Sequence, residues 1–492
     1  MSASGRPTLD DKINAAGLGW YQARLFAMLS LIVIADGMEM TVLTMLRAPA
    51  MREFGIDEYG FAVLGSVIFG GMLVGSLAGG AIADLYGRRT AMLMAGTAFC
   101  VFGVGSALAP DLYSFAFARV LTGFGVGGMV PVADSLLLEW SPTQWRSKLV
   151  MSMIGVAFAM GSILAAGSGI LLYETLGGGE GSVWWRVLLL VCTVPGLTSL
   201  PWMFFALPES VHFLMCNGRH AEAVALLKDL ERINGVELAA NAVISEREFV
   251  PGHAEGHVLD WRAWGDMFRP GVRGSTLYLV VTFSACGFVY YGFSFIYPHT
   301  LEQLYGVAPD EAFGQLMVVS VVEVMSCIAF TLYMDLELVG RRGAMLTAWF
   351  LVCVCSILAI SLKADRALFE AANLLLKGMC GAAFTVVYVY AGELIPSTVR
   401  ATAISVSGCF GRLATMCAPA ILTALLNDDV NLVYLCYLGV SGVALVAGVL
   451  QYRETLGQPL HITHDYPDSD KHRLASRNFS GEYGYQDSAR WC

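Results

Sequence analysis

Charge is scarce in this sequence. Asp, Glu, Lys and Arg make up 14% of its 492 residues, whereas 56% of the residues are hydrophobic. Soluble domains carry about 25% charged residues, so this composition excludes an ordinary soluble domain of this size. The mean hydropathy of +0.61 instead favours a chain that crosses a membrane several times.

Signatures of nucleotide, metal and disulfide chemistry are absent as well. No G-x-x-x-x-G-K-[ST] loop occurs, so the sequence offers no site for ATP-driven transport. Most of the 12 cysteines lie in apolar runs without disulfide or zinc spacing, and His253 and His257 form an isolated i, i+4 pair. We therefore predict no metal, no cofactor, no nucleic-acid partner and no enzymatic activity.

Long apolar runs account for most of the chain. About twelve of them are near the ~20 residues that cross a bilayer, and residues 1–23 lack the apolar core of a cleavable signal peptide. A charged stretch separates the runs into two sets of six, and residues 218–231 within it are predicted to form an amphipathic helix. The expected spans are 25–46, 60–83, 90–109, 112–138, 149–173, 184–207, 274–298, 312–334, 343–362, 367–391, 401–425 and 431–452.

The fold class predicted from these runs is an all-α integral membrane protein of 12 transmembrane helices in two six-helix halves. The expected segments are an N-terminus at 1–24, a first bundle at 25–207, a central loop at 208–273, a second bundle at 274–452 and a tail at 453–492. Basic residues concentrate on the side of the termini, which predicts that both termini are cytoplasmic, in the plasma membrane or an internal vesicle membrane. The basic residues expected outside are Arg47, Arg52, Arg186, Lys363 and Arg366.

Two motifs occur twice, about 250 residues apart. The first reads G-A-I-A-D-L-Y-G-R-R at 80–89 and Y-M-D-L-E-L-V-G-R-R at 333–342, where Glu337 replaces Asp84. The second, E-x-x-P-x-x-x-R, occurs at 139–146 and 393–400. Carboxylates and guanidiniums on different helices can pair when a cytoplasmic mouth closes and separate when it opens. The alternative is that they only anchor loops and fix topology. The predicted gate residues are Asp84, Gly87, Arg88, Arg89, Glu139, Arg146, Glu337, Gly340, Arg341, Arg342, Glu393 and Arg400.

Together with three further motifs, these repeats resemble the major facilitator superfamily over residues 20–455. The motifs are R-V-L-T-G-F-G-V-G-G at 119–128, P-E-S at 208–210 and R-E-T-L-G at 453–457. D-G-M-E at 36–39 and G-R-L at 411–413 resemble the branch of synaptic-vesicle-protein-related, niacin-type and organic ion carriers. The resemblance implies a monomeric transporter in which two halves rock around a central site.

Seven ionisable residues fall inside predicted spans, where each ion alone would cost about 2.5–3.5 kcal/mol. Pairing inside a polar cavity between the halves is the cheaper arrangement, and carriers bind substrate in such a cavity. The seven are Asp36, Glu39, Arg119, Asp134, Glu323, Lys377 and Arg412. Tyrosines and one phenylalanine are expected to line the same cavity, namely Tyr290, Tyr291, Phe295, Tyr388 and Tyr390.

Three roles within this set are proposed from residue type. Asp36 and Glu39 share one helix face and could couple transport to protons, or Asp36 could simply neutralise Arg119 or Arg412. Arg412 can hold a substrate carboxylate in two places, or form a permanent pair with Glu323 or Asp36, and Lys377 could do the same work. Structural ion pairing is favoured for Arg119 and Asp134.

These features predict a secondary active transporter of a small organic solute, with an aromatic monocarboxylate as the favoured class and protons as the coupling ion. Two alternatives stay open. One is a facilitative sugar or polyol carrier, and the other is a non-transporting sensor that retains the fold. The expected partners are the small-molecule substrate, protons and the lipid bilayer.

Overall fold

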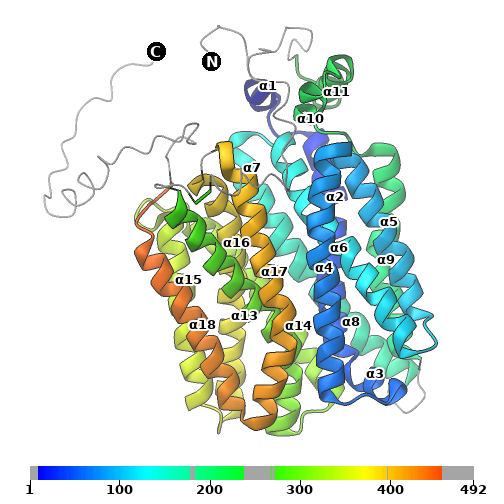
Figure 1. Ribbon diagram of the computed structural model, residues 1–492, viewed down its shortest axis with the longest axis vertical. Helices are drawn as coiled ribbons and strands as arrows, with labels where there is room; N and C mark the ends of the chain where they lie inside the picture. Colours follow the sequence, from blue (N-terminus) through cyan, green and yellow to red (C-terminus); the bar gives the residue numbers. More distant parts are fainter. Residues whose placement is uncertain (1–8, 178–182, 238–266, 269–271, 396, 457–492) are drawn as a thin grey trace, which may run out of the picture.

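The computed structural model describes residues 9–177, 183–237, 267–268, 272–395 and 397–456. Over these residues the chain forms helices and no strand. Twelve of the helices are long and apolar enough to cross a membrane, and they stand side by side in one bundle (Figure 1). The predicted fold class is therefore confirmed.

The first half contains spans one to six. Span five is one continuous rod built from α7, a π-helical turn η1 and α8. The elements are α2 (Trp20–Met45), α4 (Glu58–Tyr86), α5 (Arg88–Ala107), α6 (Leu112–Trp140), α7 (Thr143–Met151), η1 (Ser152–Ala157), α8 (Phe158–Leu176) and α9 (Trp184–Ala206).

The second half contains spans seven to twelve. Its first helix continues seven residues past the predicted end at 298. The residues after Pro298 are partly polar, so hydropathy ended the span there, but they remain helical. The elements are α13 (Arg273–Tyr305), α14 (Pro309–Tyr333), α15 (Gly340–Ser361), α16 (Arg366–Leu394), α17 (Ser397–Asp428) and α18 (Val430–Leu450).

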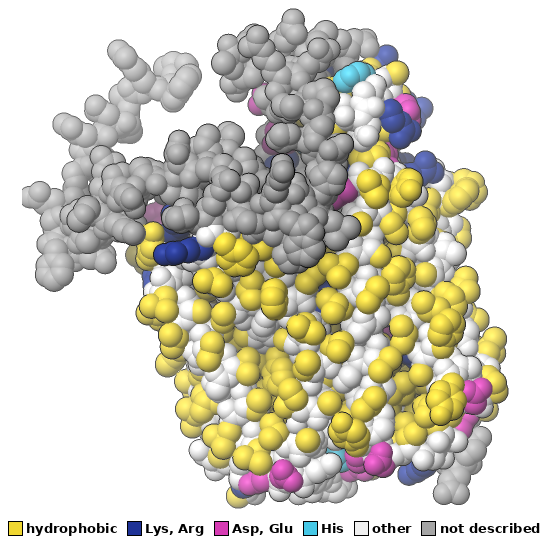
Figure 2. Space-filling view, in the orientation of Figure 1, with side chains coloured by type: hydrophobic (Ala, Val, Ile, Leu, Met, Phe, Trp, Pro, Cys, Tyr) yellow, Lys and Arg dark blue, Asp and Glu magenta, His cyan; other side chains and the backbone are white. Residues whose placement is uncertain are grey.

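Short helices mark the two ends of the bundle. We call the end that carries α1 (Leu9–Ala16), α7, α10 (Val211–Cys216) and α11 (His220–Asn234) the terminal end, and the end that carries α3 (Arg47–Phe54) the far end (Figure 1). The predicted amphipathic helix is confirmed as α11. In Figure 2 a broad hydrophobic surface separates charged side chains near the two ends, as expected for a protein surrounded by lipid.

Glycines allow the helices of one half to pack at backbone distance. A Cβ atom added at Gly75 of α4 would overlap the backbone of Phe124 in α6, and one added at Gly71 would overlap the backbone of Val120. Such small-residue contacts are the usual way in which membrane helices approach closely. Between the halves, α4 packs against α17 and α8 packs against α14.

We expect Gly75→Ala to lower the folded yield sharply, because the new methyl group meets backbone atoms, which cannot rotate away. The cost should be at least about 1–3 kcal/mol. The matched control is Gly105→Ala in α5, where an added Cβ meets nothing within 4 Å. Monodisperse yield and melting temperature in detergent measure both variants. Equal behaviour of the two would show that the α4–α6 contact does not require glycine.

Candidate functional site

A cavity lies between the two halves near the middle of the bundle. Four spans of each half contribute to its wall, namely α2, α4, α6 and the η1–α8 rod from the first half and α13, α14, α16 and α17 from the second. Its volume is about 60 Å³. The outer spans α5, α9, α15 and α18 contribute no lining residue from the described chain, so the eight inner spans enclose the cavity.

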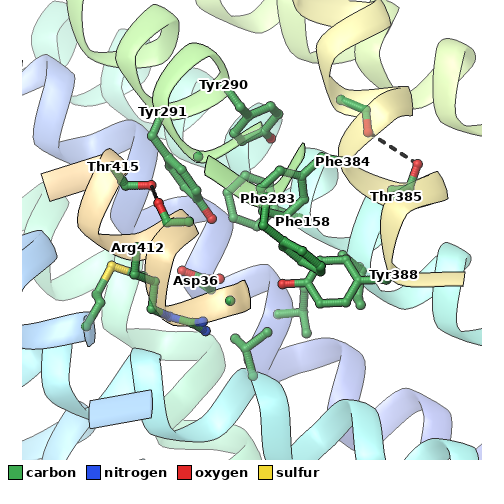
Figure 3. Close-up of a pocket in the computed structure, with 18 of the residues that line it drawn as sticks. Asp36, Phe158, Phe283, Tyr290, Tyr291, Phe384, Thr385, Tyr388, Arg412 and Thr415 are labelled. Carbon is green, nitrogen blue, oxygen red and sulfur yellow. Dashed lines mark hydrogen bonds between the residues drawn. The ribbon is translucent and has the colours of Figure 1, made fainter. Parts of the chain in front are cut away.

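Opposite charges face each other in this cavity. Asp36 of α2 and Arg412 of α17 both point toward its centre (Figure 3), and the two side chains interact electrostatically. Asp36 is 4% exposed, and its Oδ1 atom has no hydrogen-bond partner. Arg412 is half-buried and forms no ion pair within the described part of the chain. Apart from this mutual interaction, neither charge forms an ion pair with a residue that the structure describes.

Aromatic rings form most of the remaining wall. Phe384 stacks obliquely on Tyr290 with 5.3 Å between ring centroids, and Tyr291 meets Tyr290 edge-on at 5.1 Å (Figure 3). Tyr290, Tyr291 and Tyr388 line the cavity where the sequence placed them. The sequence analysis missed four phenylalanines, because Phe fits any buried helix face equally well. The seven rings are Phe69, Phe158, Phe283, Tyr290, Tyr291, Phe384 and Tyr388.

Two aromatic residues expected in the cavity lie elsewhere. Phe295 stacks on Phe61 of the other half with ring centroids 5.6 Å apart, toward the far end. The Tyr390 hydroxyl donates a hydrogen bond to the Arg453 carbonyl at the terminal end. The expectation was wrong for both, for different reasons. Phe295 shares a face of α13 with Tyr291 but lies one turn further toward the far end, whereas Tyr390, two residues after Tyr388, lies on another face of α16.

A buried ion pair lies within the first half. The Arg119 guanidinium is 2.5 Å from a Glu39 carboxylate oxygen, and both side chains are almost fully buried. Arg119 therefore pairs with Glu39, so Asp36 is not its fixed partner. Asp134 of α6 forms no ion pair with any described residue, and its Oδ1 atom has no hydrogen-bond partner. The predicted structural ion pair is therefore present for Arg119, and it is absent for Asp134 among the described residues.

A second buried cluster lies in the other half, around Lys377. Its Nζ atom is 3.7 Å from a Glu323 carboxylate oxygen, 3.0 Å from the centre of the Tyr290 ring and 2.7 Å from the Ser294 hydroxyl. The Tyr290 hydroxyl donates a 2.5 Å hydrogen bond to Glu323. Glu323 lines the cavity, whereas Lys377 stands behind it. Glu323 therefore pairs with Lys377 and not with Arg412.

The repeated motifs meet at the terminal end of each half. Arg88 lies 3.6 Å from Asp84 and 3.5 Å from Glu139. The backbone N–H groups of Arg88 and Arg89 donate to the Glu209 carboxylate at 2.8 and 3.2 Å. The chain reaches this position through Gly87, whose φ of 99° disfavours other residues. The P-E-S glutamate thus caps helix α5, an interaction that its motif alone did not reveal.

The second half repeats the arrangement with one exchanged partner. Arg341 lies 2.5 Å from Asp335 and 3.3 Å from Glu393, and its backbone N–H donates to Glu454 at 2.8 Å. Glu337 was expected to stand in for Asp84, and this was wrong. The turn lays residues 334 and 335 over the Arg341 guanidinium, which also donates to the Met334 carbonyl, and leaves Glu337 exposed.

None of these described ion pairs at the terminal end joins the two halves. Arg146 pairs with Asp10 of α1 at 2.6 Å rather than with Glu139. Arg342 donates to the Gln451 carbonyl, and Gly340, with φ of 64°, matches Gly87. The Arg400 side chain lies outside the described residues. In this conformation the motifs tie helices together within each half, as the loop-anchoring alternative requires.

The halves are instead joined at the far end. Arg47 pairs with Glu58 of its own half and, at 2.6 Å, with Glu302 of the other half. Close to it, the Thr44 hydroxyl donates a 2.9 Å hydrogen bond to the Ser294 carbonyl across the interface. The sequence analysis missed this contact, since Arg47 belongs to no repeated motif. We call the contacts of Arg47–Glu302, Thr44–Ser294 and Phe61–Phe295 the far-end seal.

Comparison with known proteins agrees with this architecture. A family model described as "Sugar (and other) transporter" matches residues 55–466. The chain is 28% identical over 476 residues to synaptic vesicle 2-related protein of Xenopus laevis, covering 92% of this chain and 82% of that protein. It is 28% identical over 464 residues to organic cation/carnitine transporter 7 of Arabidopsis thaliana, covering 86% and 89%. The proton:xylose symporter XylE of E. coli has the same fold, with a TM-score of 0.73 at 18% identity over 89% of this chain and 98% of that one.

Two substitutions test whether Asp335, and not Glu337, is the ion-pair partner of Arg341. Asp335→Asn should lower the melting temperature in detergent, corresponding to about 0.5 kcal/mol for a partly exposed ion pair. Glu337→Gln is the matched control, because Glu337 is exposed and forms no ion pair with a described residue. A larger fall in melting temperature for Glu337→Gln than for Asp335→Asn would show that Glu337, as aligned with Asp84 in the sequence, is the partner of Arg341 after all.

Proposed function

The chain belongs to the sugar (and other) transporter family within the major facilitator superfamily, and from this membership we propose a specific transport activity. The protein moves a small organic anion with an aromatic ring, such as an aromatic monocarboxylate, across the membrane. Transport is coupled to protons and proceeds by alternating access between the two halves.

The observation that carries this proposal is the pairing state of the cavity charges. Arg412 is the cavity's basic residue, and no described carboxylate holds it in an ion pair. A guanidinium can bind a carboxylate through two parallel hydrogen bonds. The seven surrounding rings suit the aromatic part of such an anion, since offset and edge-on ring contacts are favourable.

Asp36 is proposed as the proton-carrying group. Its carboxyl is buried, has one oxygen without a hydrogen-bond partner and shares the cavity with Arg412. Glu39, the other candidate, is held by Arg119 and serves as a structural partner. Binding of a substrate carboxylate to Arg412 removes the charge that stabilises ionised Asp36, so substrate and proton would enter together.

Cavity size supports rocking of the halves. The cavity of about 60 Å³ is smaller than the roughly 150 Å³ that accommodates benzene in an engineered protein cavity. An aromatic anion therefore enters only when the halves move apart. We propose that the motif pairs keep each half rigid at the terminal end during this motion, while the far-end seal breaks and reforms.

The remaining assignments follow the same model. We propose that the chain works as a monomer with the segment limits given above and that the terminal end faces the cytoplasm. The membrane is the plasma membrane or an internal vesicle membrane, and the name of the synaptic vesicle 2-related relative supports the latter.

A facilitative sugar or polyol carrier is the competing function, and the family description and the fold shared with XylE favour it. Sugars are usually held by several directed hydrogen bonds. The described lining of this cavity includes no Asn or Gln, and aromatic rings occupy much of its wall. This composition supports the aromatic anion over the sugar.

Uptake into proteoliposomes tests the proposal. We expect labelled benzoate or nicotinate to accumulate under an inward proton gradient, whereas glucose and choline do not. Arg412→Gln should lower kcat/KM about 10- to 100-fold, the value of one hydrogen bond to a charged group. Asp36→Asn should abolish the response to the gradient.

The matched controls are Arg232→Gln and Asp229→Asn, which remove exposed charges from α11 and should leave uptake unchanged. Gradient-independent uptake of glucose would replace the anion carrier with the sugar carrier. Uptake of choline that fails in Asp36→Asn would make the substrate a cation. Absence of uptake for every solute would favour the non-transporting sensor.

A further inference from the structure

The cavity and the far-end seal meet at one residue, Ser294 of α13. Its hydroxyl accepts a 2.7 Å hydrogen bond from the Lys377 ammonium, and its carbonyl accepts a 2.9 Å hydrogen bond from Thr44 of the other half. The next residue, Phe295, stacks on Phe61, and its ring lies against Gly65. One short segment of α13 thus touches a buried cation on one side and the opposite half on the other.

Lys377 connects Ser294 to the cavity through Glu323. Glu323 lines the cavity and is the carboxylate that faces Lys377. One of its oxygens accepts from Tyr290, and the other has no hydrogen-bond partner although it is buried. This second oxygen faces the Lys377 ammonium at 3.7 Å, which is beyond hydrogen-bond distance. A proton from the cavity can therefore bind it without displacing a hydrogen-bond donor.

We propose that Lys377 and Ser294 are positioning residues that transmit the charge state of Glu323 to the far-end seal. Neutralising Glu323 opens the far end. This inference rests on the proposed alternating-access function, to which it adds the connection between the content of the cavity and the choice of open side. It assigns roles to Lys377 and Ser294 beyond cavity lining or helix packing.

The direction follows from the cost of burying a charge. Lys377 is 4% exposed and has Glu323 as its carboxylate partner. When Glu323 becomes neutral, the ammonium keeps only the Tyr290 ring and the Ser294 hydroxyl, and an uncompensated buried charge is strongly unfavourable. Movement of Lys377 toward the cavity relieves this cost and removes its hydrogen bond to the Ser294 hydroxyl, which then keeps only its own bond to the Tyr290 carbonyl within α13. Ser294 is then held less firmly within the second half, so we expect the hydrogen bond from Thr44 to the Ser294 carbonyl to break more easily.

Cysteine accessibility tests the proposal without any substrate. Thr415 lines the cavity, so Thr415→Cys serves as a reporter for a membrane-impermeant maleimide, added separately from the far-end and the terminal-end side in vesicles of both orientations. Labelling of this one position is read by mass spectrometry of its peptide, which separates it from the native cysteines. Ser294→Ala, Glu323→Gln and the double variant are compared in this background.

We expect Ser294→Ala and Glu323→Gln each to speed labelling from the far-end side about five-fold, the change expected from one lost hydrogen bond. Labelling from the terminal-end side should fall, because opening of one end closes the other. In the double variant, Glu323→Gln should add nothing to Ser294→Ala. The matched control is Ser356→Ala, which removes a buried hydroxyl bonded only within its own helix α15, and it should change neither rate.

Faster labelling from both sides would show that Glu323, Lys377 and Ser294 only stabilise the packing of the helices, and it would overturn the proposal. So would independent, multiplicative effects of the two substitutions, or rates equal to those of Ser356→Ala. The outcome is separable from the uptake assay. If the labelling pattern appears but no aromatic acid is transported, the substrate class is wrong and the connection to the far-end seal stands. If uptake succeeds and labelling does not respond, only this inference fails.

Discussion

A charged side chain within a bilayer has no water to solvate it, and this constraint orders the interior of the protein. Two cations are neutralised by carboxylates of the same half, Arg119 by Glu39 and Lys377 by Glu323. With both pairs formed as in this structure, each half compensates its own buried cation without help from the other half. The charges of Asp36 and Arg412 then remain available at the interface between the halves.

Opposite ends of the bundle use ion pairs in different ways. At the terminal end, arginines and glutamates connect neighbouring helices of one half, and Glu209 and Glu454 each cap the N-terminus of a helix. At the far end, Arg47 reaches across to Glu302 of the other half. Contacts within a half can persist through rocking, whereas contacts between halves have to break. The distribution of ion pairs therefore separates rigid parts from moving ones.

Hydropathy predicted all twelve spans, because about 20 apolar residues are required to cross a bilayer whatever the neighbouring helices are. The site was predicted in part. Asp36 and Arg412 could be found because charge inside a span is rare, whereas Phe158 and Phe384 gave no signal among many buried phenylalanines. The depth of the cavity along α13 decided that Phe295 lies outside it, and turn geometry decided between Asp335 and Glu337. Neither is encoded in residue spacing alone.

The π-helical turn η1 has a further consequence for how span five is read. A π-helix contains more residues per turn than an α-helix, so a single inserted residue rotates everything after it by about 100° relative to what precedes it. Side chains after η1 are therefore offset by about one position in the sequence, although α7, η1 and α8 all pack against α14. An apolar stripe drawn along span five with an uninterrupted 3.6-residue period would place its second half on the wrong side.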